Sequence, residues 1–233
     1  YELKALIGEG GFAKVWEAYD NELDRQVAIK VLNKDIAQSE EERKRFLDEA
    51  DRAKDLKHPN IVETIDFYEK FSGFPDRPDD PPAIVMELVP STLRKLLDNR
   101  DPKHPELDIN QAVGIAIQVC EGLRHSHDND LLHRDIKPSN VLLTENEEVK
   151  IGDFGIAKTI DTSKSTDSTT TWARATEKYA PPEQLEGGKS QKGPGLDVYT
   201  TGITLYEMLT GKLPLGHAYQ PVPPIPKSLR IPT

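Results

Sequence analysis

The spacing of apolar and polar residues changes along the chain and predicts a β-rich first part and a helical second part. Residues 1–34 alternate apolar and polar positions with turn residues between the runs, which predicts a β-meander. Residues 39–56 change to helical spacing, and strand-like runs follow at 61–69 and 83–88. The first part is therefore expected to be a small antiparallel sheet with one main helix.

The predicted helix carries its own start signal and a defined buried face. Ser39 followed by Glu42 three residues later matches a capping box, in which the two residues satisfy backbone donors at the helix start. Phe46, Ala50 and Ala53 then recur at helical spacing. We expect these three side chains to pack against the sheet.

The second part is predicted to be mostly helical from Leu93 onward. A long amphipathic helix is expected near 110–127 and a last helix near 197–210. Short strand signals lie at 131–133 and in the two runs within 141–151.

Composition limits the class of protein. The chain has 233 residues and a mass of 26.1 kDa, and 36% of its residues are hydrophobic, which is typical of a folded domain. No run approaches the roughly 20 apolar residues of a membrane-spanning helix, so we expect no membrane contact by this segment. A single cysteine, Cys120, excludes an internal disulfide and favours a reducing, cytoplasmic compartment. Because the chain begins at Tyr1, we expect a piece of a longer product, and an anchor outside the segment stays open.

Charge argues against one class of partner. Acidic residues outnumber basic residues by 40 to 30, which gives a net charge of −10. Nucleic-acid-binding proteins ordinarily carry a basic surface that displaces counterions from phosphate. We therefore expect no nucleic acid partner.

A glycine-rich segment at 8–15 lies between two predicted strands. Gly8, Gly10 and Gly11 lack a Cβ, so backbone N–H groups there can approach phosphate oxygens closely. Taken alone, this signal is weak, because a tight hairpin turn, which is the commoner case, would look the same. A dinucleotide-binding turn is disfavoured because the glycines lead into a strand instead of a helix.

A lysine at the end of an apolar strand suggests that the glycine-rich segment could bind phosphate. Lys30 follows Val-Ala-Ile, where a lysine ordinarily extends along the surface toward water. Together with the glycine segment, it is placed to reach ATP phosphates. Glu49 in the predicted helix is the natural counter-charge, although it could equally be one more solvated carboxylate.

The most specific signal is the string His-Arg-Asp-Ile-Lys-Pro-Ser-Asn at 133–140, followed by Asp-Phe-Gly at 153–155. Phosphoryl transfer needs a carboxylate that orients the attacking hydroxyl, metal ligands and a cation on the transferred phosphate. Two short segments supply all of these groups, and a chance match of both strings at this spacing is rare. The assignments are Asp135 as base, Lys137 on the γ-phosphate, and Asn140 with Asp153 as metal ligands.

These motifs, in this order over nearly the whole chain, resemble those of the protein kinase catalytic domain. Their amino-acid sequences are most similar to those of bacterial eukaryote-like (Hanks-type) serine/threonine kinases. The resemblance implies an α+β, bilobal fold with a small antiparallel β-sheet N-lobe (1–88) and a mostly helical C-lobe (89–233). It implies ATP with Mg²⁺ or Mn²⁺, and Lys30, Glu49, Asp135 and Lys137 in the catalytic machinery. Lys137, two residues after the base, is the serine/threonine pattern.

The resemblance also implies an ATP site. Met86 matches the gatekeeper, and Glu87 and Val89 would offer backbone groups to adenine. The full set of ATP-binding residues that it implies is Ile7, Gly8, Glu9, Gly10, Gly11, Phe12, Ala13, Lys14, Val15, Ala28, Lys30, Met86, Glu87, Val89 and Leu142.

A hydroxyl-rich stretch follows the second motif and matches the family's activation segment. Its phosphorylation candidates are Ser168, Thr169, Thr170 and Thr171, because a phosphate there could pair with Arg134 and order the segment. A flexible polar loop is the alternative at any single position. By the same resemblance Thr176 and Tyr179 match the substrate-positioning loop, with Thr176 positioning the substrate. Glu183 ends the segment, and Asp197 and Gly202 lie in the helix that anchors the catalytic loop.

Several residues depart from the family pattern. Ala13 replaces the third loop glycine with little expected loss, whereas Ala175 and Pro181 are expected to stiffen the substrate-facing loop. Ala53 is smaller than the residue that ordinarily bridges the helix to Phe154. A weaker bridge would leave the active arrangement less populated and make dimerisation or phosphorylation more important.

Three functions remain distinguishable at this point. The leading expectation is a kinase acting on protein substrates, with a homodimer for autophosphorylation in trans as an open possibility. A pseudokinase or scaffold is disfavoured because no catalytic position is substituted, and a small-molecule kinase because the Pro-Pro-Glu segment end and the Asp197 helix are present. His125, His127 and His133 with Cys120 lack a zinc spacing, so we expect hydrogen-bonded or core histidines.

The end of the chain differs from that of a typical kinase domain. Only 20 residues follow Leu213, and six of them are proline, which disfavours helix. If the sequence is continuous and complete, we expect low stability in isolation.

Overall fold

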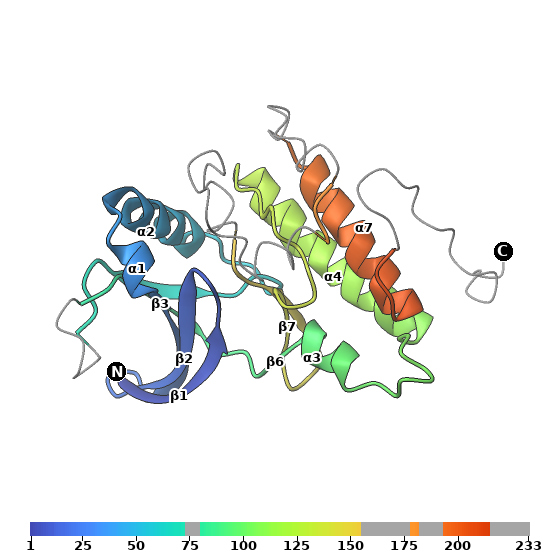
Figure 1. Cartoon of the computed structure of the whole chain (residues 1–233), viewed down its shortest axis with the longest axis horizontal. Helices are drawn as coiled ribbons and strands as arrows, with labels where there is room; N and C mark the ends of the chain where they lie inside the picture. The colour runs from blue at the N-terminus through green and yellow to red at the C-terminus, as the bar shows by residue number, and fades with distance from the viewer. Residues whose placement is uncertain (73–79, 155–177, 182–192, 215–233) are drawn as a thin grey trace.

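The structure, a computed structural model, describes residues 1–72, 80–154, 178–181 and 193–214 (Figure 1). One part is a five-stranded antiparallel sheet in the order β1-β2-β3-β5-β4. Its strands are β1 Glu2–Glu9, β2 Ala13–Asp20, β3 Arg25–Leu32, β4 Thr64–Tyr68 and β5 Ala83–Glu87. The predicted β-meander is thereby confirmed, and so are the strands expected within 61–69 and 83–88.

The main helix beside this sheet is α2, Glu40–Lys54, preceded by the short α1, Lys34–Ala37, which the sequence pattern did not predict. The Ser39 hydroxyl accepts a hydrogen bond from the Glu42 backbone N–H (3.3 Å), as expected of an N-cap. The second half of the capping box is absent, because the Ser39 N–H donates to Ile36 in α1 and the Glu42 carboxylate pairs with Arg45.

The register of the five-stranded sheet shows which residues share one face. Val15 lies opposite Lys30, Lys30 opposite Ile84, and Ala28 opposite Met86. Since side chains alternate between the two faces of a strand, these five share the face on which α2 packs. The other face carries a separate apolar cluster centred on β3 and β5.

The second part contains the longest helices and a three-stranded sheet (Figure 1). Its elements are β6 Ser91–Thr92, α3 Leu93–Asp98, α4 Ile109–Asp128, β7 Val141–Leu143, β8 Val149–Ile151 and α7 Gly195–Thr210. Both long helices occur where the sequence predicted them, and they lie side by side over one apolar core. None of the described helices is long and apolar enough to cross a membrane.

The strand signal at residues 131–133 was wrong. The Leu131 N–H donates to Ser126 at the end of α4, and the His133 N–H donates to the Asp197 carboxylate (2.9 Å). The backbone N–H groups of Leu131 and His133 therefore bond a turn and the Asp197 side chain of α7, and they do not pair with a neighbouring strand. Further along, β8 joins the two parts through a bridge between Ile61 and Ile151.

Candidate active site

A buried carboxylate at the start of α7 fixes the segment that follows α4. Asp197 is fully buried, and its side chain accepts hydrogen bonds from the backbone N–H groups of His133 (2.9 Å) and Arg134 (2.6 Å). It also lies 2.7 Å from the His127 ring. Arg134 has φ 65°, a left-handed conformation that costs a non-glycine residue about 1–2 kcal/mol. Asp197 therefore stabilises a strained turn just before Asp135.

Three polar side chains of the predicted catalytic string converge. The Asp135 carboxylate accepts hydrogen bonds from the Lys137 ammonium (2.8 Å) and from the Asn140 amide (3.1 Å). The same Asn140 NH₂ group donates to the Asp135 backbone carbonyl (2.8 Å). Asp135 is 8% exposed, so its orientation is set by these contacts. The Asn140 amide oxygen accepts a hydrogen bond from the Ser139 hydroxyl (3.3 Å).

The buried imidazole of His133 connects this cluster to the Asp-Phe-Gly segment. One ring nitrogen hydrogen-bonds the Gly152 carbonyl (2.8 Å), and the other accepts from the Asp135 N–H (3.2 Å). The ring also packs on Phe154, with 4.8 Å between centroids. Burial lowers the pKa of His133, so the neutral ring with its proton toward Gly152 is the form that matches both hydrogen bonds.

This buried histidine predicts a pH dependence of stability. The unfolded chain binds a proton at His133 near pH 6.5, whereas the folded chain does so only at lower pH, so stability rises with pH across that interval. Below pH 6.5 we expect His133 to reduce the free energy of unfolding by up to about 1.4 kcal/mol per pH unit. Urea unfolding between pH 5.5 and 7.5 should show a flatter dependence in His133→Gln; equal slopes would contradict the prediction.

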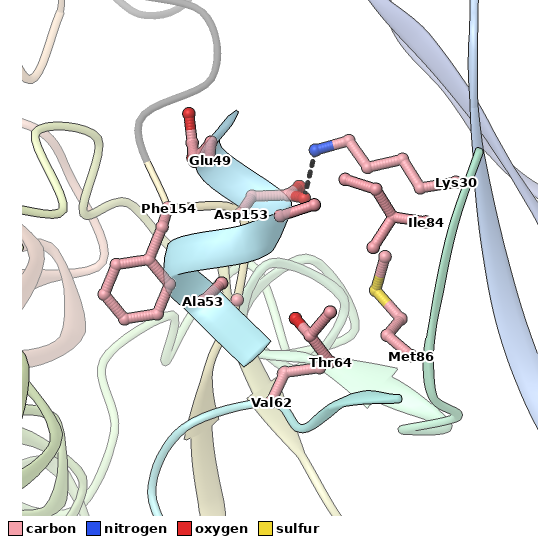
Figure 2. Close-up of a pocket in the computed structure, with 11 residues that line it drawn as sticks. Lys30, Glu49, Ala53, Val62, Thr64, Ile84, Met86, Asp153 and Phe154 are labelled. Carbon is pink, nitrogen blue, oxygen red and sulfur yellow. Dashed lines mark hydrogen bonds and ion pairs between the residues drawn. The ribbon is translucent and has the colours of Figure 1, made fainter. Parts of the chain in front are cut away.

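The lysine of β3 pairs with a different carboxylate from the one expected. Lys30 Nζ lies 2.5 Å from Asp153 Oδ1, whereas the Glu49 side chain points away from it in Figure 2. Loss of hydration would raise the pKa of Asp153, but the attraction of Lys30 outweighs it and keeps that pKa below its ordinary value. The expected Lys30–Glu49 ion pair is thus not formed here, although both residues line the same cavity.

That cavity, about 40 Å³ in volume, lies between α2, β5 and the Asp-Phe-Gly segment (Figure 2). Met86, the expected gatekeeper, forms one wall, and Ala53 and Phe154 form another. The short Ala53 side chain and the Phe154 ring thus line the same space.

Filling this space should stabilise the arrangement. Ala53→Met adds a flexible apolar side chain that can occupy the cavity, and we expect a gain of about 0.5–1 kcal/mol in the free energy of unfolding. The phosphate transfer expected from the sequence should rise severalfold, because α2 and Phe154 would be held together. Ala53→Gly should shift both quantities the other way. Unchanged melting and activity in both variants would contradict this role of the cavity.

The glycine turn is held by a residue that the motif search missed. The Asn33 side-chain amide donates to the carbonyls of Gly10 and Gly11 (both 2.9 Å), and its backbone N–H donates to Phe12 (2.9 Å). Phe12 is buried and lies 6.2 Å from the Phe46 ring of α2. A signal was available: Asn33 directly follows the β3 residue that pairs with Ala13, so it lies beside the turn.

The remaining ATP-site predictions are distributed around the sheet. Ile7 is exposed on β1, while Leu142 of β7 is half-buried. Glu87 of β5 links the two parts of the molecule. Its carboxylate accepts hydrogen bonds from the Glu63 N–H (2.7 Å) and from Lys150 of β8 (2.9 Å). Sequence reasoning assigned only backbone groups of Glu87 and therefore missed this ion pair.

A second buried network lies behind the catalytic string. The Glu207 carboxylate of α7 pairs with Arg94 of α3 (2.7 Å) and accepts from the Tyr179 hydroxyl (2.6 Å). The Arg94 N–H donates to the Pro138 carbonyl (2.9 Å). Burial and the hydrogen bond to Glu207 raise the pKa of Tyr179 above its ordinary range. Tyr179, predicted near the substrate-positioning segment, is therefore anchored to α7.

Other predicted residues lie outside the part of the chain that the structure describes. These are Ser168, Thr169, Thr170, Thr171, Ala175, Thr176 and Glu183, together with the proline-rich end after residue 214.

Two of the three histidines are placed as expected: His127 bonds Asp197, and His133 is buried in the site. In the part of the chain that the structure describes, His125 is neither buried nor bonded through its ring to Asp or Glu, and it stacks on His58 with 5.0 Å between centroids. Within the described residues, no group of three or more His, Cys, Asp or Glu side chains is arranged to hold a metal ion.

Comparisons with known proteins show what this chain is similar to. The family model for the protein kinase domain matches residues 1–222. The chain is 41% identical to a probable serine/threonine-protein kinase of Streptomyces coelicolor over 95% of its length, and 40% identical to the serine/threonine-protein kinase PrkC of Bacillus subtilis over 92%. It covers only 32% and 31% of those two relatives.

A solved structure shares the fold. The kinase domain of PknI from Mycobacterium tuberculosis, crystallised in a mutant form, superimposes with a TM-score of 0.70 and 25% sequence identity, covering 94% of this chain and 77% of that one. The α+β bilobal fold expected from the sequence is confirmed by this likeness. With the family model matching nearly the whole length, the chain belongs to the protein kinase domain family.

Proposed function

We propose that this chain is the catalytic domain of a serine/threonine protein kinase that transfers the γ-phosphate of ATP to protein hydroxyls. The observation that carries the proposal is the convergence of Lys137 and Asn140 on Asp135, with Asp153 and Lys30 linked to the same cluster through His133. A carboxylate base, two cations and two oxygen ligands are the groups that phosphoryl transfer requires. The relatives named above carry the same activity in their names.

Asp135 is the group that receives the substrate. Its carboxylate is held by Lys137 and Asn140, so it can accept the proton of a Ser or Thr hydroxyl and direct the oxygen toward the γ-phosphorus. Lys137 is placed to neutralise charge on the transferred phosphate. Most of the rate enhancement would then come from positioning and charge neutralisation, not from covalent chemistry.

The residues present are suited to a divalent cation, with Mg²⁺ favoured and Mn²⁺ as an alternative. Asn140 supplies an amide oxygen and Asp153 a carboxylate, and hard cations prefer oxygen ligands of this kind. When bound with ATP, the cation would neutralise the phosphate charge. Asp153 is at present paired with Lys30, so a cation would share that carboxylate with the lysine.

The ATP site would lie on the sheet face that carries Val15, Ala28 and Lys30. A Cβ at Gly8 or Gly10 would have its nearest contact at 3.5 Å, so packing within the protein does not require glycine at either position. Close approach of a ligand phosphate to the backbone does provide a reason. Glu87 and Val89 would present backbone groups to adenine.

Regulation and partners are part of the same proposal. Protein substrates, a cytoplasmic location for this domain and a homodimer for phosphorylation in trans follow the family pattern. Autophosphorylation at Ser168, Thr169, Thr170 or Thr171 would place a dianionic phosphate within reach of Arg134. Thr176 is proposed to position the substrate hydroxyl.

Mass spectrometry before and after incubation with ATP and Mg²⁺ tests the proposal. We expect added phosphate on Ser or Thr of the chain and of a general protein substrate, with none on small aminoalcohols or sugars. Asp135→Asn is the matched inactive variant and should remain unmodified. Nucleotide binding without any transfer would instead identify a pseudokinase, and transfer to the small molecules alone would overturn the proposed substrate class.

A further inference from the structure

Asn33 lies at the start of α1, at the position where a side chain ordinarily caps the helix. Asparagine is preferred there because its side-chain oxygen can accept a hydrogen bond from a backbone N–H of the first turn. The Asn33 side chain makes no such bond to α1. Its NH₂ group instead donates to the carbonyls of Gly10 and Gly11, both at 2.9 Å. The side chain is therefore used by the glycine turn and not by its own helix.

The glycine turn has few hydrogen bonds of its own. Among the described residues, its one internal backbone bond runs from the Gly10 N–H to the Ala13 carbonyl (3.0 Å). Gly10 and Gly11 are exposed, and glycine restricts the backbone less than any other residue. Asn33 adds three hydrogen bonds to the turn, since its backbone N–H also donates to the Phe12 carbonyl (2.9 Å). The conformation of the turn thus depends mainly on Asn33.

The hydrogen bonds from Asn33 set the direction of two backbone donors. In a trans peptide, which is the form of every described peptide bond, the C=O and N–H groups point in opposite directions. Because the carbonyls of Gly10 and Gly11 point at Asn33, the N–H groups of Gly11 and Phe12 point away from it. Neither N–H donates a hydrogen bond to any residue that the structure describes. Neighbouring backbone donors of this kind suit an anion such as a phosphate.

Phe12 fixes the same turn to the helices beside the sheet. Its side chain is buried, and its ring lies 6.2 Å from the Phe46 ring of α2. Both rings belong to one apolar cluster, against which Ile36 and Ala37 of α1 also pack. The turn is therefore held by its Phe12 side chain and by its carbonyl groups, and its two N–H groups keep their direction before a ligand binds.

We propose that Asn33 is a positioning residue that holds the glycine turn in the conformation that receives the phosphates of a nucleotide. The inference rests on the proposed function, since it assumes that ATP binds at this turn. A ligand that meets a turn already in its binding conformation does not have to order it, and its apparent affinity is correspondingly higher. Asn33 therefore acts on the affinity for nucleotide phosphates and not on the transfer step.

Calorimetric titration of the chain with ATP, ADP and adenosine in the presence of Mg²⁺ tests the proposal. Asn33→Ala removes both side-chain bonds to the turn without adding a charge, and it removes no side-chain cap from α1. We expect the Kd for ATP and for ADP to rise about tenfold, which corresponds to a turn in its binding conformation in about one molecule in ten. The Kd for adenosine, which has no phosphate, should change by less than about twofold.

Steady-state kinetics with a general protein substrate supplies an independent readout. In Asn33→Ala the KM for ATP should rise about tenfold, whereas kcat should stay within about threefold of the parent, because bound ATP orders the turn. A residue that only supports the fold would give a different result. Its loss would lower the melting temperature and the fraction of active protein, so the measured kcat would fall while the KM stayed the same.

Asn110→Ala is the matched control, because it makes the same change at an exposed position of α4 and should leave every constant within about twofold. The role of Asn33 would be disproved if Asn33→Ala bound ATP as tightly as Asn110→Ala, or if it lost as much affinity for adenosine as for ATP. Either result would leave the proposed phosphate transfer untouched. A parent chain that bound no ATP would overturn the proposed function together with this inference.

Discussion

Replacement of Asp135 by asparagine will lower the rate of phosphate transfer by at least about a hundredfold, because a positioned general base contributes on the order of 10²–10⁴. Asparagine preserves the shape of the side chain but cannot accept the hydroxyl proton. The loss should appear in kcat, since the base acts on the reacting hydroxyl. The dissociation constant for Mg²⁺·ATP should change by less than about threefold, because the proposed nucleotide contacts come from other residues.

Asp130→Asn is the matched control for this experiment. It makes the same carboxylate-to-amide change five residues earlier, at an exposed position with φ 57° that asparagine accepts readily. Phosphate transfer should stay within about twofold of the parent in that variant, as is usual for surface changes. If Asp135→Asn transferred phosphate as fast as Asp130→Asn, Asp135 would not be the base.

Much of the fold could be predicted from the sequence, because the relevant signals are local. Alternating residues specify β1 to β3, and the apolar spacing specifies α4 and α7. The failures involve partners distant along the chain. Leu131 to His133 look like a strand, but the backbone donor of His133 is claimed by Asp197, 64 residues later. No local pattern contains that information.

The site shows the same division. The strings at 133–140 and 153–155 were recognisable because phosphoryl transfer needs those residue types at short spacing. The partner of Lys30 could not be predicted from the sequence, because the Glu49 and Asp153 carboxylates compete for it. Which of them pairs with Lys30 depends on the position of α2. The position of α2 depends on tertiary contacts such as the one between the Phe12 and Phe46 rings. Asn33 was missed because it belongs to no motif.

The burial of Asp197 leads to the second large effect. Asp197→Ala would leave the N–H groups of His133 and Arg134 without their acceptor in a buried site, at about 1–3 kcal/mol for each donor. It would also release the strained backbone of Arg134. We expect a loss of about 3–5 kcal/mol in the free energy of unfolding, which is roughly 10 °C in melting temperature for a chain of this size.

Activity should fall further than stability alone explains, because Asp135 follows directly on the released turn. Measured well below the lowered melting temperature, kcat should drop by about a hundredfold, as expected when a reacting group is displaced by about 1 Å. Thr201→Val is the control: among the described residues its hydroxyl bonds only the Asp197 backbone carbonyl (2.7 Å), so its removal should cost less than about 1 kcal/mol. If Asp197→Ala had the same melting temperature and the same kcat as Thr201→Val, the Asp197 carboxylate would not be what holds the catalytic segment.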